Sequence, residues 1–401
     1  MDYVFSNRTK KITLGTAIVG LVLFLIAVFT DNADNYGTLH NGLNQRIWSS
    51  VLINGFFFFA ISLSMLFFLA LQYASEASWT IVFKRIFEAM ISVLPWMALV
   101  VVIVLAAGHF FHAHHLYHWM DSEAVAHDHL LEHKSLYFGK LFYWSRQVFF
   151  VGSFIVFAWY FRKKSLQEDE EGGTKIHKKN ITMSAIFLVI FGYGSSVIAW
   201  DWIMSIDAHW FSTLFGWYVF AGMWLTGIVF ATVLIYFLRS NGHLQIAKKG
   251  HMHDMAKWMF ALSFLWTYLF FSQFMLIWYA DIPEEVTYYI ARIQDYKGIW
   301  FGMMLVNFAL PMIFLMDADA KMKKGLVVTI GAIIFIFHWF DVYTMVTPGT
   351  MKQFGQFGFL EVGMFLLFLG VFVFLVLKSL ASRPLVVKNH PYLEESKHIH
   401  G

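Results

Sequence analysis

The sequence predicts an all-α integral membrane protein with ten transmembrane helices. Of its 401 residues, 59% are hydrophobic and only 14% are charged, whereas about a quarter of the residues in soluble domains are charged. The apolar residues also fall in blocks of about 20, the length at which a helix crosses about 30 Å of hydrocarbon. We therefore expect membrane lipids around the chain and no nucleic acid among its partners.

The apolar blocks define the ten expected spans. They cover residues 12–29, 48–71, 89–110, 138–161, 181–202, 211–238, 258–280, 298–316, 326–346 and 359–378. A short basic segment precedes the first span, but no small-residue cleavage site follows it. We therefore expect the first span to stay in the membrane and not to be removed as a signal peptide.

Lysines and arginines alternate between the two sides of these spans. Twenty-two of the 29 fall on the side that holds both termini, six fall on the other side, and Arg146 lies inside a span. Basic residues collect on the cytoplasmic side of membrane proteins. Both termini are therefore expected in the cytoplasm, and the opposite side is called the outer side below.

Two similar segments suggest an internal repeat. The fifth span ends in VIAWDWIMS and the ninth in IFHWFDVYTM, so Asp201 and Asp341 fall at similar depths four spans apart. An offset of four spans preserves the chain direction, which predicts two parallel-repeat four-helix bundles and two flanking helices. The expected units are residues 1–47, 48–202, 203–346 and 347–401.

The most polar connector joins the fourth and fifth spans. Residues 162–180 carry acidic and basic blocks around Gly172 and Gly173, a composition typical of solvated loops. We expect a mobile cytoplasmic linker there, and a short irregular tail after residues 382–384.

Charged residues inside the spans require an explanation, because each costs at least ~2.5–3.5 kcal/mol at bilayer depth. Arg146 lies about 13 Å from the outer end of its span, counting about 1.5 Å per residue. It is therefore expected to pair with Asp201 or Asp341. A purely structural ion pair between helices would explain Arg146 equally well.

Asp341 and His338 lie three residues apart and share one face of the ninth span. Such a pair is suited to accepting a proton and passing it to water, since histidine titrates near neutral pH. The alternative is a hydrogen-bonded structural histidine. Glu361 lies only about 3–5 Å inside the tenth span.

Two outer connections are unusually polar or aromatic. The tight turn within residues 199–218 holds Asp201, Asp207 and His209, which an interfacial aromatic belt does not explain. Residues 280–295 are expected to form an amphipathic surface helix with Pro283 at its first position, acting as a solvated cap.

The third span ends in a histidine-rich segment, GHFFHAHHLYHW, at residues 108–119. His109 and His112 are expected to extend a proton exit route, whereas His114, His115 and His118 are expected to be solvated. No cysteine and no HExxH-type pattern accompany these histidines, so no metal site is expected. The lack of cysteine in the whole chain also excludes thiolate-bound iron–sulfur clusters and covalently attached haem within it.

Two long segments resemble a known family. DMAKWMFALSFLWTYLFFSQFMLIWYADIPEE (254–285), followed by NFALPMIFLM (307–316), resembles membrane subunits of the polysulfide-reductase/NrfD type. Together with AWDWIMSIDAHWFSTLFGWYVFAG (199–222), the segments resemble the second such subunit of bacterial alternative complex III, a quinol:cytochrome c oxidoreductase.

The resemblance implies a multi-pass subunit of a bacterial inner membrane complex in the respiratory electron-transport chain. Its implied partners are a c-type cytochrome, an iron–sulfur subunit and a second NrfD-like subunit, and these partners would carry all haem and iron–sulfur centres. The implied role is quinone or quinol binding, or proton translocation. The residues that the resemblance matches to this role are Asp201 and His209 in the turn after the fifth span, and His338 and Asp341 in the ninth span. The polar residues inside the spans add Arg146 to the expected outer-half site, with His109, His112 and Glu361 nearby.

Three other functions remain open at this stage. A haem b cytochrome would need two buried histidines facing each other, and only His338 lies securely inside a span. A secondary transporter is disfavoured, because paired Gly/Pro-broken helices are not evident. A scaffold that only holds neighbouring subunits is the third alternative.

Overall fold

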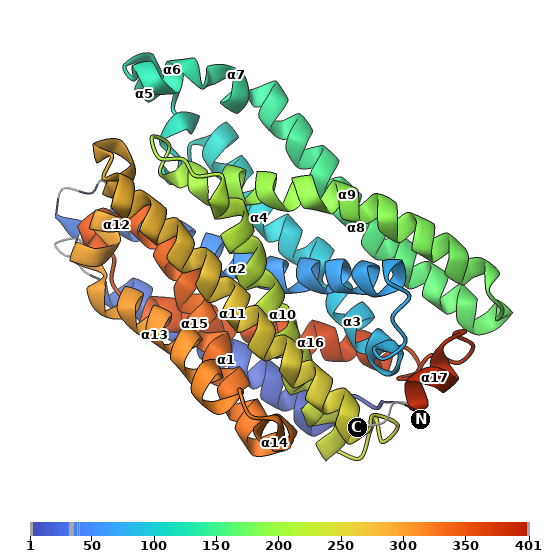
Figure 1. Ribbon diagram of the computed structural model, residues 1–401. Helices are drawn as coiled ribbons and strands as arrows, with labels where there is room; N and C mark the ends of the chain where they lie inside the picture. The colour runs from blue at the N-terminus through green and yellow to red at the C-terminus, as the bar shows by residue number, and fades with distance from the viewer. Residues whose placement is uncertain (1–2, 32–35, 38, 40, 399–401) are drawn as a thin grey trace.

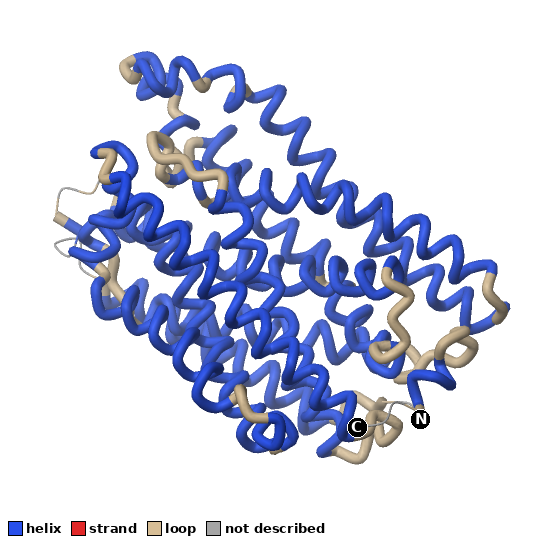
Figure 2. The backbone as a smooth tube through the Cα atoms, viewed as in Figure 1, coloured by secondary structure: helices blue, strands red, loops and turns tan. Residues whose placement is uncertain are grey.

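The computed structural model describes residues 3–31, 36, 37, 39 and 41–398. Within these residues the chain forms ten helical segments that are long and apolar enough to cross a membrane. The predicted all-α, ten-span fold class is confirmed, and Figure 2 shows helix throughout the body of the molecule with loops at its two ends.

The long helices follow the order of the expected spans. They are α1 (Asn7–Thr30), α2 (Gly42–Ala74), α3 (Lys84–Ile91) with α4 (Leu94–Phe111), α8 (Lys140–Glu171), α9 (Lys175–Trp202), α10 (Leu214–Ser240), α11 (Lys249–Ala280), α13 (Lys297–Phe314), α15 (Lys324–Met351) and α16 (Phe359–Ala381). The shorter helices are α5 (Ser122–Ala126), α6 (His129–His133), α7 (Ser135–Phe138), α12 (Pro283–Asp295), α14 (Ala318–Met322) and α17 (Leu393–Lys397).

The bundle has two chemically different ends (Figure 1). The basic end holds α14, α17 and both termini, together with the connections 172–174 and 241–248. The histidine end holds α5, α6, α7 and α12, together with the connections 112–121 and 203–213. These two names are kept below, and the expected cytoplasmic position of the basic end stays a prediction.

α2 forms the centre of the fold. It packs against α4 and α9 on one side and against α10 and α15 on the other. Its apolar side chains are almost fully buried, including the run Phe56–Phe59, because helices surround it on all sides. α4, α8 and α9 therefore lie on one side of α2, and α10, α11, α13 and α15 on the other. A repeat relation between these two groups stays a prediction.

The first and last long helices pair with each other. α1 and α16 cross at Gly20, Gly363 and Gly370. A Cβ atom at Gly20 would lie 2.3 Å from the Leu367 backbone nitrogen, and one at Gly370 would lie 2.6 Å from the Ala17 nitrogen. Only glycine permits so close an approach of two backbones, as in other small-residue crossings of membrane helices.

The third span is interrupted near the basic end. α3 ends at Ile91 and α4 begins at Leu94, with the residue Pro95 at its second position. Pro95 has no backbone N–H to donate to the Ile91 carbonyl, so the hydrogen-bond ladder of the helix is interrupted at this point. Sequence reasoning missed this break.

The expected mobile linker at 162–180 is wrong. α8 continues to Glu171, only Gly172–Thr174 form the turn, and Glu168 is fully buried. The tail after residue 384 is also more ordered than expected, because Val387 and Leu393 pack on Ile81 and α17 closes the segment.

Candidate functional site

Asp201 forms the first buried carboxylate site, at the end of α9. Both carboxylate oxygens accept from Arg146 at 3.1 Å, and Gln147 and Tyr137 donate at 2.7 and 2.9 Å. The expected pairing of Arg146 is thus with Asp201, because α8 and α9 are packed neighbours. Four donors and one full positive charge satisfy this buried carboxylate.

Tyr137 extends the Asp201 site toward the histidine end. Burial first, and then the Asp201 carboxylate, raises the pKa of Tyr137, so its hydroxyl stays protonated and donates to Asp201. Arg146 lies over the Tyr137 ring at 3.9 Å and donates to the Tyr137 carbonyl. The short helix α7 therefore covers the ion pair.

Asp341 forms the second buried carboxylate site, in the middle of α15. It accepts from the Tyr218 hydroxyl and, at 3.0 Å, from Trp266 Nε1. His338 Nδ1 lies 3.7 Å from Asp341 Oδ2, the oxygen that also accepts from Trp266, and the two residues are one helical turn apart as expected. Both side chains are almost completely buried, and His338 is the only group in the described residues that forms an ion pair with Asp341.

Several buried polar atoms on α15 and the helices beside it lack hydrogen-bond partners among the described groups. A cavity of about 20 Å³, lined by His338, Asp341 and Thr226, has room for one water molecule. His338 Nε2 finds no hydrogen-bond partner in the described protein, and neither do Asn307 and the Gln273 amide nitrogen. These residues come from α15, α13 and α11, and α13 packs against both of the others. Such groups are usually satisfied by ordered water, so this group of helices is suited to hydration.

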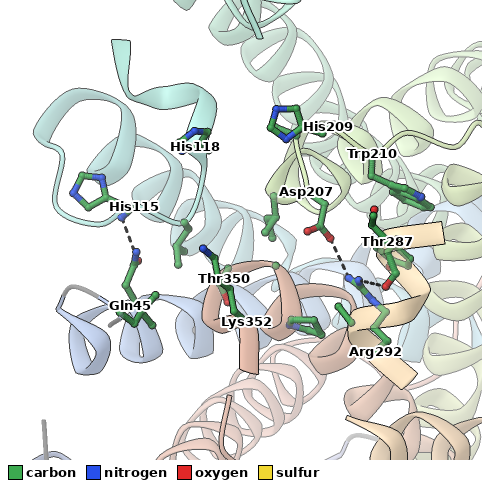
Figure 3. A pocket seen from close by; sticks show the side chains of 18 residues that line it. Gln45, His115, His118, Asp207, His209, Trp210, Thr287, Arg292, Thr350 and Lys352 are labelled. Carbon is green, nitrogen blue, oxygen red and sulfur yellow. Dashed lines mark hydrogen bonds and ion pairs between the residues drawn. The ribbon is translucent and has the colours of Figure 1, made fainter. Parts of the chain in front are cut away.

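A polar pocket of about 470 Å³ opens at the histidine end (Figure 3). Its lining combines acidic, basic and imidazole groups from several elements, among them His118, Asp207, His209, Tyr288, Arg292 and Lys352. Figure 3 shows Asp207 and Arg292 pointing toward one another, and their closest oxygen and nitrogen lie 3.2 Å apart.

Arg292 anchors α12 beneath this pocket. It is 2% exposed and donates to the carbonyls of Tyr288, Thr344 and Met345 at 2.8–3.0 Å. The expected amphipathic surface helix with Pro283 at its start is present, and its first turn is largely exposed, whereas Arg292 and two tyrosines bury the opposite face. Sequence reasoning missed Arg292; the amphipathic pattern of α12 was the available signal.

Tyr288 links the pocket electrostatically to Asp341. Burial raises the pKa of Tyr288, Arg292 opposes this shift, and the carboxylates of both Asp207 and Asp341 reinforce it. The rings of Tyr218 and Tyr288 both contact Phe215, with centroids 6.0 and 6.4 Å from it. The pKa of Tyr288 is therefore raised both by Asp207, which lines the pocket, and by Asp341 of α15.

His209 lies at the rim of the pocket and not inside either carboxylate site. It is largely exposed, and its Nε2 lies 2.5 Å from Asp128, which precedes α6. Although desolvation opposes it, the hydrogen bond with His209 lowers the pKa of Asp128. The five expected site residues thus divide among three places: Arg146 with Asp201, His338 with Asp341, and His209 at the rim.

The histidine-rich segment divides between buried and solvated rings. His109 is 3% exposed, its Nδ1 finds no partner among described groups, and its ring packs against Trp119. His112 ends α4 in the left-handed conformation and is exposed, as are His115 and His118.

The expected solvation of His114 is wrong. Its ring is buried beside Gly108, with Nε2 2.9 Å from the Val104 carbonyl, and burial lowers its pKa. A Cβ atom at Gly108 would lie 2.6 Å from this ring, so the glycine makes room for it.

Glu361 is held in a separate ion pair. Both of its oxygens accept from Arg46 at 2.7 Å, and one also accepts from the Gly358 nitrogen at the start of α16. Glu361 therefore closes the first turn of α16 and fastens it to α2.

Three residues at the basic end have the spacing of metal ligands. Ligand atoms of Glu168, His177 and His390 lie within 4.8 Å of one another. However, Lys84 Nζ lies 2.7 Å from Glu168, and His390 Nδ1 accepts from the Tyr392 nitrogen, so the neutral ring carries its proton on Nε2. These contacts indicate that the three residues form an ion-pair cluster that holds the tail in place, and they disfavour a metal site.

The geometry also disfavours haem b. The His338 ring meets Trp266 edge-to-face with centroids 4.9 Å apart, and the His109 ring meets Trp119 at 5.5 Å. A haem would have to displace these aromatic neighbours to reach either imidazole.

A third cavity lies beside the Asp201 site. It has a volume of about 320 Å³, and its mostly apolar lining includes Tyr137, Phe138, Trp200, Trp210 and Phe211. Cavities of this size commonly bind small, largely apolar ligands that a few polar groups of the protein hold in one orientation.

No protein-family model matches the chain, and no curated protein matches it either.

Proposed function

We propose that the chain is a membrane subunit, without redox centres of its own, of a quinol-oxidising respiratory complex, and that His338 and Asp341 take up and release protons. The chain's resemblance to the second NrfD-like subunit of alternative complex III supports the assignment to such a complex. The haem and iron–sulfur centres would then belong to partner subunits, and the bacterial inner membrane would be its location.

The observation that carries the proposal is the charge balance at Asp341. No lysine or arginine pairs with this buried carboxylate in the described structure, so its charge is balanced only when His338 carries a proton. An unbalanced charge on a buried group is costly. One proton, on either the imidazole or the carboxyl group, would remove this imbalance, and two neighbouring groups that can each carry a proton are what a proton-transfer site requires.

The polar pocket gives this proton an exit. Tyr218 donates to Asp341, and the rings of Tyr218 and Tyr288 both contact Phe215. Tyr288 lines the pocket next to Asp207 and Arg292. Hydroxyl reorientation and water in the neighbouring cavity would complete the transfer, and the exposed histidines at the rim would buffer it.

The test is an Asp341→Asn variant in the intact complex with all partner subunits. Quinol-dependent proton release is expected to fall on the order of 100-fold, because a proton-transfer group is lost while the shape of the side chain is kept. Glu284→Gln at the exposed start of α12 is the matched control and should leave proton release unchanged. Normal proton release by the Asp341→Asn complex would refute the proposal.

A quinone head group beside Asp201 is the second candidate, favoured by the 320 Å³ cavity. The cavity borders Tyr137, whose hydroxyl is bonded to Asp201, and its lining is largely aromatic. A photoreactive quinone analogue should label residues 208–213 of the complex, and excess quinol should prevent the labelling. Labelling confined to partner subunits would remove this candidate and leave the proton-transfer role intact.

A further inference from the structure

A groove at the basic end lies outside both carboxylate sites. It is about 700 Å³ in volume and runs between the α3–α4 break and α8. The upper part is apolar and is lined by Pro95, Ile155, Val156 and Trp159. The break separates α3 from α4 at this level, so the third span leaves α8 uncovered here.

The lower part of the groove is strongly positive. Arg162 and Lys163 on α8 and Arg383 after α16 all line it. In the described chain none of the three forms an ion pair with a carboxylate, and Arg162 donates only to the Ser379 hydroxyl, at 2.6 Å. No acidic residue lines the groove.

Two buried cations at the same end, by contrast, have carboxylate partners. Lys84 pairs with Glu168 at 2.7 Å, and Arg85 pairs with Glu88 at 2.5 Å. Holding several unpaired cations close together costs free energy, because like charges repel one another. Their convergence at one end of an apolar groove therefore points to a negatively charged occupant.

Trp159 and Lys163 set the depth of the groove in the membrane. Trp159 is 60% exposed on the outside of the helix bundle, and Lys163 Nζ lies 4.6 Å from the centre of its ring. Tryptophan and lysine occupy the boundary between hydrocarbon and head groups, where a long lysine side chain can reach the phosphate layer. The cations thus lie at phosphate level and the apolar lining at acyl-chain level.

We propose that this groove binds an anionic glycerophospholipid from the adjacent leaflet. Its phosphate would lie among Arg162, Lys163 and Arg383, and its acyl chain would follow Val156 and Ile155 toward the middle of the membrane. Charge complementarity selects an anionic lipid over a neutral one, and the length of the apolar lining selects a lipid over a free anion. The bound lipid would fill the space that the α3–α4 break leaves beside α8.

The test uses the full-length protein in bilayers of phosphatidylcholine and measures the immobilised fraction of spin-labelled phosphatidylglycerol by electron paramagnetic resonance. Arg383→Gln is the main variant, because Arg383 is exposed and outside the helices, so the fold should survive. The relative affinity for phosphatidylglycerol is expected to fall about fivefold, the effect of one cation near the membrane surface. Lys323→Gln, an exposed basic residue at the same end, is the matched control and should leave the affinity unchanged.

Two further measurements separate the possible occupants. Val156→Trp, which fills the apolar part, should lower the immobilised fraction of phosphatidylglycerol even though all three cations remain. Spin-labelled phosphatidylcholine should show weaker immobilisation than phosphatidylglycerol in the wild-type protein. Equal immobilisation of the two lipids, an unchanged affinity in Arg383→Gln, or exclusion of both lipids by a partner helix in the intact complex would overturn the proposal.

Discussion

The two buried aspartates of this fold differ in how their charge is balanced. Asp201 lies against an arginine and receives four hydrogen bonds, whereas Asp341 receives two bonds from neutral groups and, among the described residues, has only a histidine as an ion-pair partner. Arginine keeps its charge at every pH the protein meets, but histidine does not. The charge of Asp201 is therefore balanced by a permanent cation, whereas under the proposal above the charge balance of Asp341 depends on the proton of His338.

The comparison also shows that depth and residue type alone do not define a proton-transfer site. Both aspartates are almost completely buried, and both were expected at a similar depth. The neighbouring cation and the number of hydrogen bonds distinguish them. A structural role is therefore the better interpretation of Arg146 and Asp201, and the functional proposal depends on His338 and Asp341.

The largest effect on stability is expected from Arg146→Met. This change leaves the Asp201 carboxylate buried and unpaired, which should lower the free energy of unfolding by about 3–5 kcal/mol. Denaturant titration in mild detergent measures the loss. The double variant Arg146→Met/Asp201→Asn should recover most of the stability, and a double variant as unstable as the single one would contradict the assignment of a compensated pair.

A third buried cluster, formed by Lys84, Glu168, His177 and His390 at the basic end, is expected to make the docking of the tail depend on pH. Burial first, then Lys84 and His177, lowers the pKa of His390 to about 2 from its ordinary value of 6.5. The folded ring thus resists protonation, while a detached tail takes up the proton below about pH 6.5. The docked tail should have its full stability above this value and lose about 2 kcal/mol between about pH 7 and about pH 5.

Hydrogen exchange of residues 385–398 at a series of pH values measures this loss. Glu168 and Tyr392 also face the ring, so the variant His390→Gln, which cannot titrate, provides the comparison. It should reduce the pH dependence of exchange. An undiminished pH dependence in this variant would assign the effect to another group of the cluster.

Asp341→Asn should cost much less stability than Arg146→Met. The amide keeps the volume of the carboxylate and leaves no buried cation without a partner, so the loss is about 1 kcal/mol, the value of one weakened hydrogen bond. Unfolding of the purified chain measures it. A loss as large as that of Arg146→Met would mean that Asp341 is also a structural ion-pair residue, and the contrast between the two sites would disappear.

The smallest effect is expected at His209. It is exposed and pairs with Asp128 at the surface, where ion pairs contribute little. His209→Ala should leave the unfolding midpoint unchanged within error, and the same holds for Asp128→Asn. A marked loss of quinol-dependent proton release in His209→Ala, with stability unchanged, would instead show that the rim histidine is part of the exit route.

The sequence was sufficient where an interaction is local or where hydropathy dominates. The ten spans follow from apolar blocks, and His338 meets Asp341 because one helical turn separates them. Arg146 required a carboxylate, and the adjacency of α8 and α9 decided which one.

Contacts between distant parts of the chain could not be predicted in the same way. Glu361 meets Arg46 across 315 residues, and Arg292 meets Asp207 across 85. No periodicity in a single sequence identifies such partners. The error at 162–180 was avoidable, because residues 165–171 are mostly good helix formers and Glu168 needed only a buried cation to be stable inside the fold.

The crossing of α1 and α16 has a consequence for how the chain is made. The partner of the first helix is the last one, and their glycines fit only each other's backbones. During synthesis α1 must therefore wait in the lipid, with its contact face uncovered, until α16 leaves the ribosome. A chain that stops before α16 keeps that face of α1 exposed to lipid.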